Sequence, residues 1–401
     1  MRIAFFIGSI DISGGTYVIL QHALAAVAEG HSVTLVALLP YTPAMRDWHP
    51  ALRQLPLFPL AALAETQFDL AIATWWKTAL ELHRIPAKRY AYFVQSIESR
   101  FYPPEERPLR RLVEATYDWG LPGITEASWI QAHLARQHNQ PLALAPNGVR
   151  KDLYRPEGPS AAPRLPPGRL RVLVEGPFGV PFKNVGRTLA LMRQARVAET
   201  WLLTASDLPA FPGVARLFSR VPIAAVAPIY RACDVLVKLS LVEGMFGPPL
   251  EMFHCGGTAV VYQVTGHEEY IVPEHNALVL PCHDEAGVVA AVRRLQEDPA
   301  LLGRLQQGAL ETAARWPDWP EASQTFWQGL FSRLAHQPSP DRAALTEWSD
   351  QAWQAYAEAE RERLAAAPGL RLRQALQQRL DRLPRAWSLP LRMGKYLWSA
   401  R

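Results

Sequence analysis

Short apolar runs alternate with helical patterns through the first 145 residues of the chain. The run from Arg2 to Gly8 is typical of a buried parallel strand, and a helical pattern follows from about Thr16 to Glu29. Further apolar runs predict strands at 32–38, 69–74, 89–95, 119–125 and 142–145. Strands that alternate with helices in this way predict a parallel sheet with helices on both faces.

A second series of the same kind follows a break in the pattern. Residues 156–168 are dense in Pro, Gly, Ser and Ala, which indicates a linker. New apolar runs predict strands at 170–175, 200–204, 234–237, 258–262 and 277–280. We therefore expect an α/β protein with two doubly wound, Rossmann-like domains, over 1–155 and 169–336. Ligands of such sheets bind beyond the carboxyl ends of the strands, so we expect the site in the cleft between the domains.

The last part of the chain has a different pattern, from which we predict a basic helical extension over 337–401. Residues 361–401 contain nine Arg and one Lys against one Glu and one Asp, whereas the whole chain has a formal charge of only +5. Two sets of mainly apolar residues in this extension each recur at the spacing of one helix face. The first is Leu345, Trp348, Ala352, Tyr356 and Ala359, and the second is Leu372, Leu376, Leu380, Leu383 and Trp387.

An anionic partner suits such a basic extension. We hypothesise that its arginines, together with Trp387, Leu391, Leu397 and Trp398, rest on the anionic inner face of a membrane. The alternative is a charged helix that is solvated or packed on the rest of the protein. We expect no nucleic-acid partner.

Composition and targeting signals narrow the class of protein. The chain has 401 residues, of which 49% are hydrophobic and 20% charged, a balance typical of soluble globular proteins. Its three cysteines have neither a paired nor a metal-ligand spacing, which fits a reducing compartment. The N-terminus lacks a signal-peptide pattern, and no apolar stretch reaches the length of a membrane span. We therefore expect a cytoplasmic protein, peripheral on the cell membrane if the extension binds there.

The segment from Ser240 to Val261 carries the clearest chemistry. In it, Glu243 and Glu251 flank a glycine-containing turn that opens a helix at Pro248-Pro249. A helix start after such a turn offers free backbone N–H groups and the positive end of the helix dipole, which suit a diphosphate. Glu251 can accept hydrogen bonds from a ribose diol, and Glu243 can meet the hydroxyls of a sugar. The alternative is an incidental pair of glutamates on an ordinary Rossmann helix.

This segment resembles glycosyltransferase family 4, the retaining GT-B glycosyltransferases. The family has a pair of glutamates around a Gly-Phe-Gly-type turn, followed by Gly-x-Pro-Val-Val. The similar stretches here are Glu243-Gly-Met-Phe-Gly-Pro-Pro-Leu-Glu251 and Gly257-Thr-Ala-Val-Val261. The resemblance continues at 230–235, 266–271 and 276–279, and covers nearly all of residues 1 to about 335 in order. It is closest to the bacterial surface-polysaccharide rhamnosyltransferase-like subgroup, because a Phe-Val-Gln stretch, here Phe93-Val94-Gln95, ends a strand.

The resemblance implies a GT-B fold whose last helix, here about 319–335, crosses back toward the first domain. It implies that Lys183 and Glu243 are catalytic, with Lys183 neutralising the leaving diphosphate. Pro177 stands where the family has an arginine, which puts full binding of the diphosphate in doubt. The implied donor-binding residues are Gly14, Gly15, Lys183, Asn184, Glu243, Met245, Phe246, Gly247 and Glu251. The alternatives are a plain tight turn at Gly14-Gly15 and a surface lysine at 183.

Candidate acceptor-binding residues come from the first domain. Trp75 and Trp76 follow a predicted strand end and so face the cleft, where they could stack on a sugar, or else they belong to the core. Gln95 can form a hydrogen bond with a sugar but has no basic group, and many family members carry a histidine near this point. Asn147-Gly148-Val149 resembles the family's interdomain Asn-Gly-Val, with a plain turn as the alternative.

Together these features predict a retaining glycosyltransferase that moves a sugar from a nucleotide-diphosphate donor to a glycan or lipid-linked acceptor, in bacterial surface polysaccharide or lipopolysaccharide synthesis. The chain contains no Asp-x-Asp, so we expect no metal and no cofactor besides the donor substrate. The subgroup favours dTDP-rhamnose or a UDP-sugar. One alternative is a non-catalytic nucleotide-sugar or glycan-binding protein on the same fold. Another is a dehydrogenase or epimerase, which the absence of Gly-x-Gly-x-x-Gly at Gly14-Gly15 disfavours.

Overall fold

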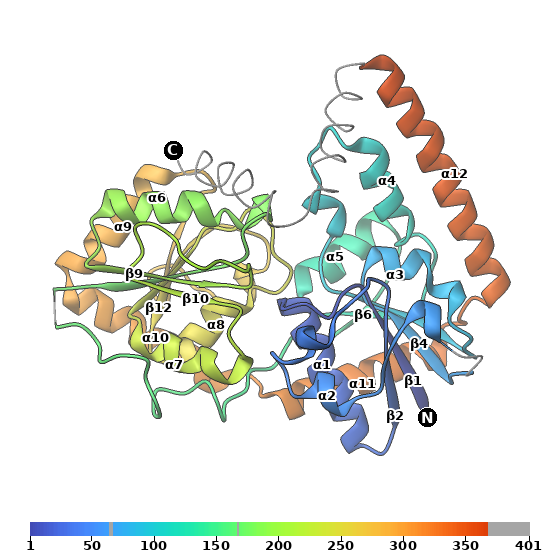
Figure 1. The fold of residues 1–401 in the computed structure, drawn as a ribbon, viewed down its shortest axis with the longest axis horizontal. Coiled ribbons are helices and arrows are strands. Elements are labelled where there is room, and N and C mark those ends of the chain that lie inside the picture. The colour runs from blue at the N-terminus through green and yellow to red at the C-terminus, as the bar shows by residue number, and fades with distance from the viewer. Residues whose placement is uncertain (64–66, 167, 368–401) are drawn as a thin grey trace.

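A computed structural model describes residues 1–63, 67–166 and 168–367 of the chain. Their strands form two sheets in which every pair of neighbouring strands is parallel. Each sheet lies in its own domain, and the two domains lie side by side (Figure 1). The predicted fold class, two Rossmann-like domains followed by C-terminal helices, is confirmed.

The first sheet has seven strands in the order β3-β2-β1-β4-β5-β6-β7. Its central strand β1 (Arg2–Ile7) is buried from Ile3 to Ile7, as expected of a strand covered on both faces. Helix α1 (Gly14–Ala28) follows, and the Ser13 side chain caps it by accepting a hydrogen bond from the Thr16 N–H. The other elements are β2 (Ser32–Ala37), α2 (Ala51–Gln54), β3 (Leu57–Pro59), β4 (Leu70–Ala73), α3 (Trp76–Leu80), β5 (Tyr90–Val94), α4 (Arg107–Ala115), β6 (Gly123–Thr125), α5 (Ser128–Gln137) and β7 (Ala143–Leu144).

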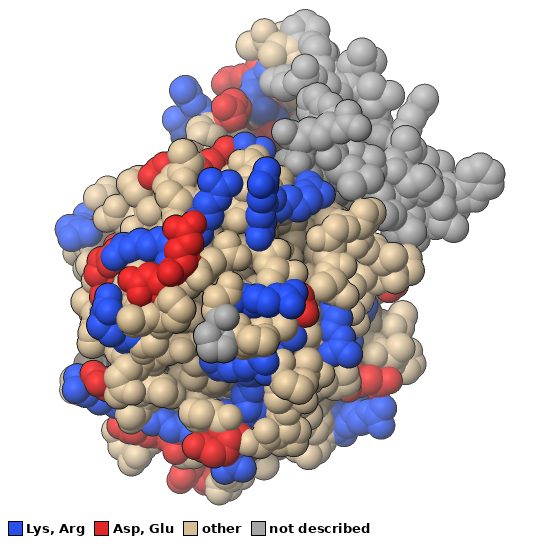
Figure 2. Space-filling model, turned by 90° about the vertical axis from the view of Figure 1, so that its left-hand side faces the viewer, with Lys and Arg blue, Asp and Glu red and all other residues tan. Residues whose placement is uncertain are grey.

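The second sheet has six strands in the order β10-β9-β8-β11-β12-β13. The outer face of this domain is turned toward the viewer in Figure 2, where Lys and Arg are interspersed with Asp and Glu. The elements are β8 (Arg171–Glu175), α6 (Val185–Ala195), β9 (Glu199–Thr204), β10 (Arg216–Ser219), α7 (Val226–Ala232), β11 (Val235–Lys238), α8 (Gly247–His254), β12 (Thr258–Tyr262), β13 (Ala277–Leu280), α9 (Glu285–Glu297) and α10 (Pro299–Arg315).

Helix α11 (Trp319–His336) follows the second domain in sequence but packs on the first, against α1, β6 and β7. Its Phe326 ring stacks on the His22 ring, with a centroid distance of 3.9 Å and an interplanar angle of 15°. The indole N–H of Trp327 donates to the His22 carbonyl at 3.1 Å. Burial lowers the pKa of His22 to about 3, so the ring is neutral and packs as part of the core.

Two strands were missed at the sequence level, β3 and β10. Both lie at a sheet edge, where one side of the strand has no neighbour. Edge strands bury less of their surface: Phe58 in β3 is 45% exposed, and no residue of β10 is fully buried. The sequence of β10 lacks the continuous apolar run that marks a central strand, and the apolar run around β3 is interrupted by Pro56 and Pro59, which is typical of an edge strand. The strands predicted at 119–125 and 142–145 are shorter in the structure, as β6 and β7.

The described part of the C-terminal extension is helix α12 (Arg342–Ala366), which contains the first of the two predicted apolar sets. It packs on α4, and its own residue Leu345 is buried. The second apolar set and the proposed membrane-facing residues lie outside the described residues, so both remain predictions. Among the described helices, none combines the length and apolar character needed to cross a membrane.

Replacement of Phe326 by alanine tests the contribution of α11 to the first domain. Phe326 is fully buried between His22 and Phe93. We expect Phe326→Ala to lower the free energy of unfolding by about 3–5 kcal/mol because it leaves a cavity. The matched control is Trp353→Ala on α12, at a side chain that is 38% exposed, for which about 1 kcal/mol or less is expected. Urea denaturation followed by circular dichroism measures both, and equal losses would contradict the packing described.

Candidate functional site

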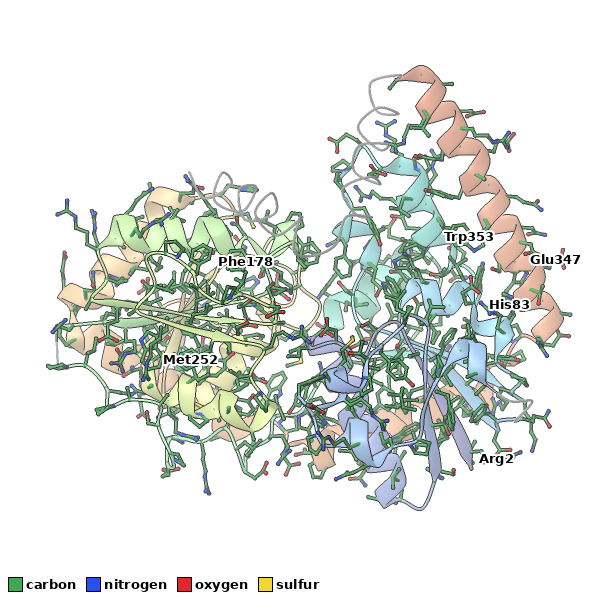
Figure 3. All side chains as sticks on the ribbon, viewed as in Figure 1. Arg2, His83, Phe178, Met252, Glu347 and Trp353 are labelled. Carbon is green, nitrogen blue, oxygen red and sulfur yellow. The ribbon has the colours of Figure 1, made fainter. Side chains whose placement is uncertain are left out.

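A cavity of about 670 Å³ lies between the two domains. Side chains of both domains meet along this boundary (Figure 3). Residues that line it follow the carboxyl ends of strands in each sheet, where ligands of parallel α/β sheets bind. From the first domain these include Gly8, Trp75, Gln95 and Glu126, and from the second Glu175, Ala205, Arg220 and Lys238.

The predicted catalytic pair, Lys183 and Glu243, forms one ion pair on the wall of this cavity. Lys183 ends the short 3-10 helix Pro181–Lys183, and Glu243 lies in the loop between β11 and α8. The Lys183 Nζ donates to Glu243 Oε2 at 2.7 Å. Burial opposes ionisation of Glu243, but the ammonium groups of Lys183 and Lys238 outweigh it and lower the pKa of this carboxyl below its ordinary value. The second oxygen, Oε1, is buried and has no hydrogen-bond partner among the described residues.

A second lysine, Lys238, was not identified from the sequence. It ends β11, its side chain is 3% exposed, and its Nζ is hydrogen-bonded to the carboxylate of Glu175. Burial disfavours the charged ammonium, but the carboxylates of Glu175 and Glu243 outweigh that effect and raise the pKa of Lys238. The cavity wall therefore holds two lysine ammonium groups, Lys183 and Lys238, although Pro177 occupies the position of the family's arginine.

Glu251, in the second turn of α8, lies on the same cavity wall. Burial and the carboxylate of Glu175 raise its pKa to about 8, while the nearby Tyr154 and Tyr230 hydroxyls and the Lys238 ammonium offset part of this rise. Near neutral pH the carboxyl is therefore mostly protonated. It can donate one hydrogen bond as well as accept others, which suits a ligand with hydroxyl groups.

Two further buried carboxyls of the first domain line the cavity, Glu98 and Glu126. Burial raises the pKa of Glu98 to about 8, and its Oε2 accepts from the Trp76 backbone N–H at 2.8 Å. Burial also raises the pKa of Glu126, to about 7. Glu126 contacts both domains: its Oε2 accepts from Asn147 Nδ2 at 2.9 Å, and its Oε1 accepts from the Met245 N–H at 3.1 Å.

Most of the predicted site residues come together at the cavity, and a few do not. Trp76 is only 1% exposed, in the core of the first domain, where its indole donates to the Tyr102 hydroxyl at 3.1 Å. Phe246 is fully buried, and Asn184 links Lys183 to α6 with a left-handed φ of 53°. These three side chains do not line the cavity. Those that do are Gly14, Gly15, Trp75, Gln95, Lys183, Glu243, Met245, Gly247 and Glu251.

The residues missed from the sequence share a recognisable signal. Glu126, Glu175 and Lys238 each end or directly follow a strand, at the edge of the sheet that faces the cleft. Arg220 follows β10, a strand that was itself missed, and its guanidinium pairs with Asp11 of the first domain at 2.7 Å. A search for charged residues at the last position of every predicted strand or directly after it would have found the first three.

A metal site was not expected from the sequence. Within residues 1–63, 67–166 and 168–367, no group of three or more His, Cys, Asp or Glu side chains is arranged to hold a metal ion. Independence of the proposed activity from metal ions remains a prediction, which experiment must test.

The second domain matches a known family of enzymes. Residues 202–298 match the family model described as Glycosyl transferases group 1. The matched segment contains both Glu243 and Glu251.

Two curated relatives are similar to this chain, one over most of its length and the other over a short segment. The O-antigen biosynthesis protein RfbC of Myxococcus xanthus is 28% identical over 290 residues, which are 70% of this chain and 22% of the relative. The lipopolysaccharide core biosynthesis glycosyltransferase LpsD of Rhizobium meliloti is 35% identical over 81 residues, 20% of this chain and 24% of the relative. The chain thus spans less than a quarter of the length of each of these relatives.

Solved structures share the whole two-domain arrangement. HepE from Anabaena, in complex with UDP-glucose, has a TM-score of 0.64 at 16% identity, over 83% of this chain and all of that one. Similarity at this level of identity concerns the fold, and the fold is GT-B.

The raised pKa of Glu251 makes a prediction about stability and pH. An acid whose pKa is raised by folding stabilises the folded state fully below its unfolded pKa, and this stability is lost as the pH rises through the folded value. For Glu251 the loss falls between about pH 4.5 and about pH 8. Glutamine resembles the protonated acid, so we expect the melting temperature of Glu251→Gln to fall less than that of the wild type from pH 5 to pH 9. Parallel curves for the two proteins would contradict the assignment.

Proposed function

We propose that the chain is a retaining glycosyltransferase that transfers a sugar from a nucleotide-diphosphate donor to a glycan or lipid-linked acceptor. The observation that carries the proposal is that Lys183, Glu243 and Glu251 line one interdomain cavity. The group 1 match over residues 202–298 supports the reaction class. The similarity to proteins named for O-antigen and lipopolysaccharide core biosynthesis supports a role in surface polysaccharide or lipopolysaccharide synthesis.

The donor diphosphate would bind between Lys183 and the start of α8, at the positive end of the helix dipole. Pro248 and Pro249 carry no N–H and the Gly247 N–H donates to the Met245 carbonyl at 3.0 Å, so Lys183 would supply the main contact. It would compete with Glu243 for the Lys183 ammonium. Glu243 would then accept hydrogen bonds from the donor sugar, and Glu251 would bind hydroxyls of the donor. Trp75 and Gln95, on the opposite wall, would contact the acceptor.

In the proposed reaction the bond between the sugar C1 and the diphosphate oxygen breaks, and a bond from C1 to the acceptor oxygen forms on the same face. The acceptor proton moves to the departing diphosphate oxygen. The protein therefore supplies position and charge stabilisation rather than a nucleophile. The fixed positions of Lys183 and Lys238 favour this, because cations already in place need no reorganisation when negative charge develops on the leaving group.

One observation favours a second candidate, a nucleotide-sugar or glycan-binding protein without catalysis. Pro177 replaces the arginine of the family on the cavity wall, which removes a cation from the diphosphate site. Slow hydrolysis of UDP-glucose or dTDP-rhamnose by the purified protein would decide against this candidate.

Substitutions of Lys183 and Glu251 test the site. We expect Lys183→Ala and Glu251→Ala each to lower transfer at least about 100-fold, because each removes a group that stabilises the bound donor or the departing diphosphate. The matched control for charge is Lys88→Ala, at an exposed lysine that pairs with Asp69 away from the cavity. Donor turnover is measured on variants that melt within a few degrees of the wild type. Near-normal rates for both site variants would overturn the assignment.

A thermal-shift screen tests the donor class. UDP, dTDP, GDP and ADP are each added in large excess to the wild-type protein. We expect one of them to raise the melting temperature, since a ligand that binds only the folded state stabilises it by about 2.7 kcal/mol at 100 times its dissociation constant. The same nucleotide should shift Lys183→Ala less. No shift with any of the four would count against a nucleotide-sugar site.

A further inference from the structure

One peptide group of the second domain has both of its polar atoms bound by the first domain. This is the peptide between Gly244 and Met245, directly after Glu243. Its carbonyl accepts a hydrogen bond from the Trp129 indole N–H at 2.9 Å. Its N–H donates to Glu126 Oε1 at 3.1 Å. Two side chains of the first domain therefore fix the orientation of the backbone next to the catalytic carboxylate.

The close approach of the two domains at this point depends on glycine. A Cβ atom built on Gly244 would lie 2.0 Å from the Gln95 carbonyl oxygen and 3.0 Å from Glu126 Oε1. Contact with backbone at such a distance is forbidden, so any larger residue at 244 would push the domains apart. Gly244 is thus required by the contact between the domains as well as by the turn.

Glu126 is held in place by its own neighbours. It follows β6, is 5% exposed, and its second carboxyl oxygen is bound by Asn147 Nδ2 at 2.9 Å. Asn147 is anchored in turn, because its carbonyl accepts from the Trp316 indole N–H at 2.7 Å. Nothing in the proposed chemistry of donor and acceptor uses Glu126, yet it is one of the most buried carboxyls of the cavity.

We propose that Glu126 and Trp129 are positioning residues, which hold the Gly244–Met245 peptide and thereby orient Glu243 toward the donor sugar only when the two domains are in contact. The inference rests on the proposed function of the cavity. Lys183 and Glu243 both belong to the second domain, so their ion pair does not need the first domain. The Glu243 carbonyl accepts from Thr265 Oγ1 of the second domain at 3.3 Å. The side-chain contacts on the Gly244–Met245 peptide come from Glu126 and Trp129 of the first domain, and these complete the positioning of Glu243.

Binding of the nucleotide and turnover of the donor should therefore depend on different parts of the protein. The nucleoside diphosphate is bound by the second domain, whereas correct placement of Glu243 requires both domains. A displacement of about 1 Å at a reacting group can cost on the order of 100-fold in rate. Loss of either positioning residue should therefore lower turnover far more than it weakens binding of a nucleoside diphosphate.

The chain offers a matched pair of substitutions at position 126. Glutamine keeps an oxygen that accepts from the Met245 N–H. Its amide N–H₂ faces Asn147 Nδ2, so rotation of the Asn147 amide by 180° is needed to bring the acceptor Oδ1 there, an atom that is buried without a partner among the described residues. Alanine keeps neither contact. Trp129→Phe removes only the indole donor, and Trp119→Phe, at a tryptophan that packs against Trp348 of α12, is its control.

The experiment compares these variants and Gly244→Ala with the wild type in two assays. Binding of UDP, dTDP, GDP and ADP is measured by calorimetry, and turnover is measured with the matching UDP-glucose, dTDP-rhamnose, GDP-mannose or ADP-glucose. We expect Glu126→Ala and Trp129→Phe to lower kcat about 10- to 100-fold, with nucleotide affinity changed less than about 3-fold. Glu126→Gln should stay within about 5-fold of the wild-type kcat, since it keeps the hydrogen bond to the peptide.

Small-angle X-ray scattering of the same proteins without ligand gives a second, independent readout. Gly244→Ala should increase the radius of gyration because its methyl group displaces the first domain.

Wild-type kcat in Glu126→Ala and Trp129→Phe would overturn the inference. So would an equal loss of turnover, nucleotide affinity and melting temperature, which would indicate a merely structural role. If the wild type neither binds nor turns over any of the four nucleotides, the proposed function fails instead. In that case an unchanged radius of gyration in Gly244→Ala would still refute the contact between the domains.

Discussion

The ion pair between Lys183 and Glu243 determines whether an anionic ligand can enter the cavity. Five carboxyls line the cavity: Glu98, Glu126, Glu175, Glu243 and Glu251. Two of them, Glu175 and Glu243, are paired with Lys238 and Lys183. Burial raises the pKa of Glu126 to about 7 and that of Glu98 and Glu251 to about 8, which keeps much of their charge neutralised near neutral pH. The cavity thus combines many hydrogen-bonding oxygens with little net negative charge, a combination that a polyhydroxylated anion needs.

The local part of this site could be predicted from the sequence because it lies within one short segment. Glu243, the glycine turn and the start of α8 are neighbours along the chain, so their spacing alone indicates their geometry. The pairing of Lys238 with Glu175 could not be predicted in this way. These residues are 63 positions apart and meet only because β11 pairs with β8. Apolar runs predict the strands, but the order of strands in the sheet comes from packing of the whole domain.

Two adjacent residues after a strand illustrate a second limit of prediction from the sequence. Trp75 and Trp76 have the same side chain and are neighbours in the segment after β4, yet Trp75 lines the cavity and Trp76 is buried in the core. The Trp76 backbone N–H donates to Glu98, and its ring contacts Tyr102, both in the segment that follows β5. The direction of each ring therefore depends on neighbours that sequence periodicity does not reveal. The edge strands β3 and β10 were missed for a related reason, since their patterns reflect one-sided pairing.

The return of α11 to the first domain has a mechanical consequence. Within residues 1–63, 67–166 and 168–367 the chain passes from the first domain to the second and back, and the two connections touch. Val149 pairs with Asp318, and a Cβ on Gly148 would lie 2.4 Å from the Asp318 carbonyl oxygen. Two connections joined along one line behave as a hinge with a single axis, so twisting and sliding of the domains are restricted. Rotation about that axis would separate Glu126 from Met245 while Lys183 and Glu243 move together as part of one rigid body.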